Sequence, residues 1–198
     1  MTHFSPLPLD QWPVEMRDAM SAMTPPNPRY VVSRRPDGPK ALNILGMLAH
    51  HPALAKAFFT FNGHLLRATT LSERQRELLI LRAAAVRGAE YEFAQHLVLG
   101  QDAGVSAEEI PWIAWGPDAS IWTESDAALL RATDELISAG AIDSDTLSTL
   151  SQHLDVRQIL DVIFTVGAYE TLGWMLQSFE VELDEDIRKA IGVRESPS

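Results

Sequence analysis

Glu77 is the residue whose type and position most clearly indicate chemistry. On a helical wheel its nearest neighbours are Leu81 and Ala84, and Arg76 is predicted on the opposite side. Burying a carboxylate among apolar side chains is unfavourable by on the order of several kcal/mol unless it is paired or protonated. We therefore expect burial to raise the pKa of Glu77, which suits a general acid or base near neutral pH. The alternative is a structural glutamate satisfied by a helix-end amide or an arginine.

The next helical segment supplies a candidate partner for this carboxylate. Glu92 and His96 are four residues apart and share one helix face. The short turn at Gly88 and Ala89 predicts two antiparallel helices, which can bring that face beside Glu77. A glutamate–histidine pair at such a seam is a candidate proton relay. The alternative is an ordinary ion pair between residues four apart on an exposed helix.

Helical spacing and capping residues predict the elements that hold these side chains. Ser72 with Gln75 forms a capping box, and Asp155 with Gln158 caps a second, long helix. The predicted helices cover 41–50, 52–67, 72–87, 90–103, 123–139, a segment from 144, and 155–179. Sustained alternation of apolar residues is missing, so a sheet is not expected. We predict one all-α domain over 41–190, with a motif hairpin at 71–110 and a second helical half at 123–187.

The first forty residues are predicted to be a separate N-terminal region. A short helix is expected over Asp10–Met23, with Pro13 in its first turn. Five prolines within Thr24–Lys40 exclude a helix or a central strand and predict an extended arm. This arm either wraps a neighbouring subunit, covers a pocket or simply connects two helices.

A weak internal repeat links the two helical halves. The segment 76–79 followed by Gly88-Ala89 parallels the segment 157–160 followed by Gly167-Ala168. The pattern suggests two related helical hairpins, although two apolar helices of similar length can produce such a match by chance.

One stretch of about forty residues resembles a known family. It comprises the run Glu77-Leu-Leu-Ile-Leu, the run from Ala89 to His96, then Gly104 and Glu108-Glu109-Ile110. It is similar to the signature of the carboxymuconolactone decarboxylase and alkylhydroperoxidase D family, in which a glutamate precedes C-x-x-C-x-x-x-H by twelve residues. Here Ala89 and Glu92 occupy the cysteine positions and His96 the histidine position. The resemblance implies an alkylhydroperoxidase D-like helical bundle that forms a homo-oligomer, as a dimer, trimer or hexamer.

The chain contains no cysteine, which excludes one activity of that family. In the thiol-using members, the resemblance implies, the glutamate and histidine move protons to and from the cysteine pair during peroxide reduction. Without sulfur there is neither nucleophile nor electron carrier, so a thiol peroxidase is excluded. The decarboxylase members work without a cofactor on a small lactone acid.

We therefore expect a cofactor-independent acid–base enzyme of the decarboxylase, lyase or isomerase type. Its substrate would be small and either carboxylated or cyclic and apolar, with Glu77, Glu92 and His96 catalytic. The candidate substrate-binding residues are Tyr91, His64, Arg67 and Arg34. The rival hypothesis is a non-catalytic ligand-binding or structural member that lost its chemistry with its cysteines. Whether the protein is an enzyme at all stays open at this point.

Charge and composition limit the classes of ligand and partner that we expect. The formal net charge of −11 argues against nucleic acid, while residues 1–87 hold 11 Lys and Arg against 6 Asp and Glu. This cationic first part favours an anionic small-molecule substrate. No set of His, Asp and Glu has metal-ligand spacing, so no metal is expected. Charged residues interrupt the apolar run 159–179, which predicts a core helix without membrane contact. Prolines near the N-terminus interrupt any signal-peptide pattern, so we expect a cytoplasmic protein.

Overall fold

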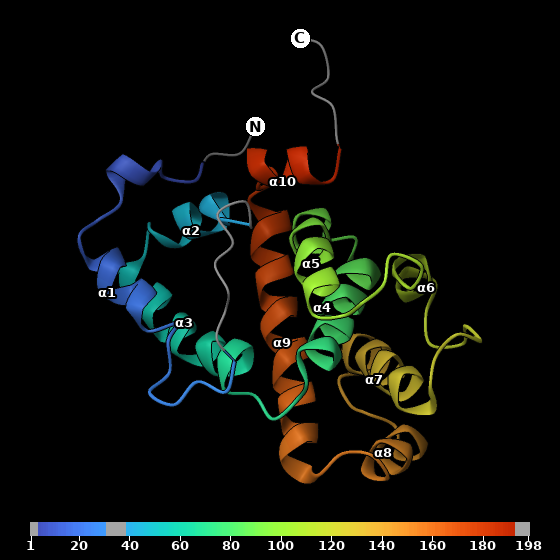
Figure 1. Ribbon diagram of the computed structural model, residues 1–198. Helices are drawn as coiled ribbons and strands as arrows, with labels where there is room; N and C mark the ends of the chain where they lie inside the picture. Colours follow the sequence, from blue (N-terminus) through green and yellow to red (C-terminus); the bar gives the residue numbers. More distant parts are fainter. Residues whose placement is uncertain (1–3, 31–38, 193–198) are drawn as a thin grey trace. The chain divides into compact units, whose positions relative to one another are not determined.

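A computed structural model describes residues 4–30 and 39–192 of the chain, and all their regular elements are helices (Figure 1). The elements are the 3-10 helix η1 (Leu9–Gln11) and the α-helices α1 (Glu15–Ser21), α2 (Leu42–Leu48), α3 (Pro52–Arg67), α4 (Glu73–Arg87), α5 (Glu90–Asp102), α6 (Ile110–Trp115), α7 (Glu124–Ala139), α8 (Ser144–Ser151), α9 (Val156–Ser178) and α10 (Glu185–Ala190). The predicted all-α fold class is confirmed.

The chain divides into two compact units. Unit 1 comprises Met1–Ala68 together with Met175–Ser198, and unit 2 comprises Thr69–Trp174. The whole motif hairpin, with the three candidate catalytic residues, lies in unit 2.

Unit 1 is built on the packing of α1 against α3. Its buried cluster consists of Met16, Ala19, Leu45, Leu48, Ala49, Ala55 and Phe59. The first helix is shorter than predicted, because the chain forms η1 and then restarts at Glu15. Trp12 precedes Pro13 and adopts an extended conformation, φ −65° and ψ 132°, as the proline ring requires of the residue before it.

The proline-rich arm is irregular where the structure describes it. Residues 24–30 form neither helix nor strand, and the amides of Arg29 and Tyr30 donate to the carbonyl of Arg67 at 2.6 and 2.9 Å. Residues 31–38, which include Arg34, lie outside the described residues.

The motif hairpin of unit 2 forms where the local sequence predicts it. The Ser72 side chain accepts from the amide of Gln75, whose side chain accepts from the amide of Ser72, at 3.1 and 2.9 Å. Gly88 ends α4 in the left-handed conformation, with φ 61°, and the Ala89 amide returns to the carbonyl of Ala84. The helix α5 then runs back along α4 (Figure 1).

Helices α7, α8 and α9 complete the core of unit 2. Their buried cluster with α4 consists of Leu71, Leu79, Ala128, Leu129, Ala132, Leu150, Leu154, Val162 and Val166. A buried carboxylate anchors α9, because Asp161 accepts from both the amide and the hydroxyl of Thr70 at 2.6 Å. Gly167 and Ala168 lie inside α9, so the segment that parallels the motif hairpin in sequence is one continuous helix.

Among the helices that the structure describes, α9 alone is long and apolar enough to cross a membrane by length and composition. Within its most apolar window, 56% is buried inside the structure, as in the core helix of a folded domain. A single such helix is weak evidence for a membrane span.

Candidate active site

The Glu77 carboxylate is fully buried, and both of its oxygens are hydrogen bonded. Its Oε1 accepts from Nε and Nη2 of Arg76 at 3.1 and 2.9 Å. Its Oε2 lies 2.7 Å from Nδ1 of His96, which comes from α5. The seam between the helices is tight here, since a Cβ on Gly100 would stand 3.1 Å from Leu81. The hairpin therefore brings Glu77 and His96 together.

Two expectations about Glu77 are wrong. Burial by itself raises its pKa, but His96 and Arg76 together outweigh burial, so the pKa lies below its ordinary value. Arg76 does not point away from it, because the flexible arginine side chain folds back along the helix surface and becomes buried itself. Glu77 is thus an ionised, paired carboxylate at neutral pH.

The raised pKa belongs to Glu92. This residue on α5 is buried, and no described residue hydrogen bonds to its Oε1. Burial first, and then the negative charge of Glu170, raise the pKa of Glu92 well above its ordinary value. Its Oε2 packs beside Gly173 of α9, where an added Cβ would stand 3.2 Å away. Burial therefore favours the protonated form of Glu92, and among the described residues it forms no ion pair with His96.

Helix α9 contributes a side chain that the sequence analysis did not single out. The ring of Tyr169 meets the ring of His96 edge to face, with centroids 5.0 Å apart. Burial and the charge of Glu77 raise the pKa of the Tyr169 hydroxyl well above its ordinary value. In the sequence Tyr169 fits core or interface packing equally well. The available signal was its spacing of one helical turn from Gly173, with Glu170 between them on an apolar helix.

Glu170 of α9, whose charge raises the pKa of Glu92, belongs to an ion pair with α4. Glu170 accepts from Nε and Nη2 of Arg87, the last residue of α4, with its shortest contact at 2.6 Å. The Arg87 guanidinium lies at the C-terminal end of α4, where a positive charge also complements the helix dipole. The pair fixes α4 to α9.

The four predicted substrate-binding residues lie in different parts of the chain. Tyr91 is buried on α5, within unit 2. His64 and Arg67 belong to α3 of unit 1, where His64 is exposed and Arg67 donates to the hydroxyl of Thr24 at 2.7 Å. Arg34 lies outside the described residues. In the described part of the chain, the structure finds no group of three or more His, Asp or Glu arranged to hold a metal ion.

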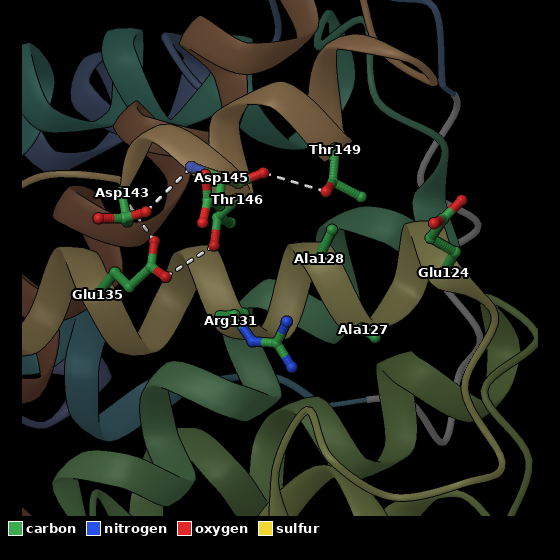
Figure 2. A pocket seen from close by; sticks show the side chains of 9 residues that line it. All are labelled: Glu124, Ala127, Ala128, Arg131, Glu135, Asp143, Asp145, Thr146 and Thr149. Atoms are coloured by element: carbon green, nitrogen blue, oxygen red, sulfur yellow. Dashed lines mark hydrogen bonds between the residues drawn. The ribbon is translucent and has the colours of Figure 1, made fainter.

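A separate cavity of about 400 Å³ opens between α7 and α8 (Figure 2). Its lining residues are Glu124, Ala127, Ala128, Arg131, Glu135, Asp143, Asp145, Thr146 and Thr149. The polar groups here mainly cap and join the two helices: Glu135 accepts from Thr146 at 2.7 Å and from the amide of Asp143 at 2.8 Å. The cavity contains none of the predicted site residues.

Fold and site together define an all-helical protein with a buried glutamate–histidine pair across an antiparallel hairpin. Residues 52–135 match the model of the Carboxymuconolactone decarboxylase family. The match covers 84 of the 198 residues, and the chain contains no cysteine. A search of curated proteins found no significant match.

Solved structures share the fold. A protein from Agrobacterium tumefaciens related to the antioxidant defence protein AhpD is 22% identical, with a TM-score of 0.64 over 70% of this chain and 95% of its own. A peroxidase-related protein from Ralstonia eutropha JMP134 with an AhpD core is 14% identical, with a TM-score of 0.74 over 94% of both chains. The debrominase Bmp8, solved as a cysteine-to-alanine variant in complex with 2,3,4-tribromopyrrole, is 14% identical, with a TM-score of 0.72 over 97% of both chains.

Proposed function

We propose that this protein is a cofactor-independent acid–base enzyme acting on a small carboxylated or cyclic apolar substrate, in a decarboxylation, another lyase reaction or an isomerisation. The observation that carries the proposal is the opposite pKa shift of two buried carboxyl groups in one site, Glu77 downward and Glu92 upward. Pairs of titratable groups whose environments push their pKa values apart are typical of paired acid and base roles.

In the proposed mechanism His96 is the base. Because the ionised Glu77 can only accept, Nδ1 of His96 carries the hydrogen of their 2.7 Å bond and Nε2 is the acceptor. When Nε2 takes a proton from the substrate, Glu77 stabilises the imidazolium that forms. Glu77 thus positions His96 and holds its charge.

Glu92 is the acid in this mechanism. In its protonated form it gives its proton to the atom that gains electron density, which in a decarboxylation is the carbon that carbon dioxide leaves. The electron pair of the broken C–C bond then becomes the new C–H bond. His96 releases to solvent the proton that it took from the substrate, and Glu92 takes one from solvent, so both groups return to their starting forms. The debrominase with a bound bromopyrrole supports a ring-shaped substrate for this fold, at the level of analogy.

The test is turnover of a panel of small unsaturated lactones, each with and without a carboxylate, followed by NMR in D2O for carbon dioxide release and deuterium incorporation. Glu77→Gln and His96→Ala should each lower the rate about 100-fold or more with helicity unchanged. The matched control is His153→Ala, since His153 contacts Glu124 at an exposed site. Full activity in both site variants contradicts the proposal.

One observation favours the rival function, a non-catalytic ligand-binding or structural protein. Glu77 is neutralised by fixed internal partners, which is what a relic of an active site would show. Ligand binding without conversion of any panel compound would establish that alternative.

A further inference from the structure

We infer that the site on α4, α5 and α9 selects an uncharged molecule with an acidic O–H or N–H group, such as a phenol or an azole, rather than a carboxylate. The inference rests on the proposed function, because it takes the same side chains as the ligand site, and among the reactions proposed there it favours those that need no carboxylate on the substrate. It revises the expectation of an anionic substrate that the charge of residues 1–87 suggested.

The first argument is the pairing of the cations of unit 2. Its sequence contains no lysine, and each of its arginines forms an ion pair with a carboxylate. These arginines are Arg74, Arg76, Arg82, Arg87, Arg131 and Arg157. A carboxylate ligand would have to give up its hydration beside charges that are already neutralised, which is unfavourable without a new counter-charge.

The second argument is the hydrogen-bonding capacity that the site leaves unused. Among the described residues nothing bonds to Nε2 of His96, to the hydroxyl of Tyr169 or to Oε1 of Glu92. In a neutral imidazole with its hydrogen on Nδ1, Nε2 can accept, whereas a tyrosine hydroxyl and a protonated carboxyl can each donate. Together they present one acceptor and two donors. An O–H or N–H group that donates to Nε2 and accepts from a neighbour satisfies them.

The third argument concerns the charge of the site as a whole. Arg76 neutralises Glu77, and Arg87 neutralises Glu170. The raised pKa of Glu92 favours its protonated form, which adds no charge to these two neutralised pairs. A cationic ligand would need Glu92 to ionise in its buried position against Gly173, which burial disfavours. An uncharged donor requires no such ionisation.

The experiment compares four probes that share a benzene ring: phenol, anisole, benzoate and benzylamine. Binding to the full chain is followed at pH 7 through the imidazole ¹⁵N signals of labelled histidine, with the His96 signal assigned by its loss in His96→Asn. Phenol should move the Nε2 signal of His96 and bind at least about tenfold more tightly than the other three, because only phenol is uncharged and donates an O–H. No phenol binding, or equal or tighter binding of benzoate or benzylamine, overturns the inference.

Tyr169→Phe keeps the ring against His96 and removes the hydroxyl, so it should weaken phenol binding about fivefold. The matched control is Tyr30→Phe in unit 1, which should leave phenol binding unchanged. An unchanged affinity in Tyr169→Phe removes this residue from the site. The measurement is of binding, not turnover. Selective phenol binding without conversion of the lactone panel would therefore contradict the proposed enzymatic function and support the inference about the ligand. Turnover that depends on His96, together with tighter benzoate binding, rejects the ligand class alone.

Discussion

Nδ1 of His96 lies 2.7 Å from Oε2 of Glu77, across the seam between α4 and α5. With Arg76 on the other oxygen, the glutamate is held ionised in a position without solvent exposure. Three groups therefore lie near this seam: a fixed carboxylate, a histidine with one nitrogen bonded to it, and the buried carboxyl of Glu92, whose pKa is raised.

Replacing Glu77 by glutamine should destabilise the protein by about 3 kcal/mol or more, because Arg76 would stay buried without its counter-charge. The measurement is urea unfolding at pH 7, with Glu108→Gln as the control, since Glu108 is exposed and should stay within about 0.5 kcal/mol of wild type. The pKa of Glu77 is lowered on folding, so its stabilisation is present above the unfolded pKa and is lost as pH falls through the folded one. The gap between wild type and Glu77→Gln should therefore close in acid; a variant as stable as wild type at pH 7 contradicts the pairing.

Glu92 predicts the opposite pH dependence. Its folded pKa is raised, so the folded state holds a proton that the unfolded chain releases once pH exceeds about 4.5. Wild type should lose stability relative to Glu92→Gln as pH rises through this window, at up to about 1.4 kcal/mol per pH unit. Urea unfolding of both proteins at a series of pH values from about 4 upward measures the difference in their free energies of unfolding. Parallel stability profiles of the two proteins would show that Glu92 is already ionised.

Gly173 and Gly167 form a matched pair on α9. A Cβ at Gly167 meets nothing within 4 Å, so Gly167→Ala should stabilise the helix by about 0.8 kcal/mol. A Cβ at Gly173 stands 3.2 Å from Oε2 of Glu92 and must displace it, so Gly173→Ala should gain less or destabilise. Thermal unfolding compares the two variants. Equal stabilisation would mean that the Glu92 carboxyl does not pack against α9.

The Arg87–Glu170 pair should influence the pKa of Glu92. Removing the charge of Glu170 in Glu170→Gln takes away a repulsion and leaves Arg87 positive nearby, so the pKa of Glu92 should fall. Carboxyl ¹³C titration of labelled glutamate measures the direction. Asp134→Asn, which breaks the Arg82–Asp134 pair elsewhere in unit 2, is the control and should leave the pKa of Glu92 in place. A rise of that pKa in Glu170→Gln contradicts the electrostatic account.

Local sequence was sufficient to predict the helices α3, α4, α5, α7 and α9 and the pairing of the hairpin. Capping bonds join residues three positions apart, as in Ser72–Gln75 and Asp155–Gln158, so they can be read without knowing the fold. The glycine turn then sets the antiparallel return that brings His96 to Glu77. The absence of cysteine, and with it the exclusion of thiol chemistry, is likewise a property of the sequence.

The pKa values of the site and the side chain that α9 contributes to it depend on tertiary packing. The pKa of Glu77 depends on whether Arg76 folds toward it, and that of Glu92 on the charge of Glu170, far along the chain. Tyr169 enters the site only because α9 packs beside α5. A wheel gives the direction of each Cβ, but it gives neither the reach of a side chain nor the long-range contacts that set pKa values. The sequence therefore placed Glu77, Glu92 and His96 on one hairpin, and the fold determined which carboxyl has the lowered pKa and which the raised one.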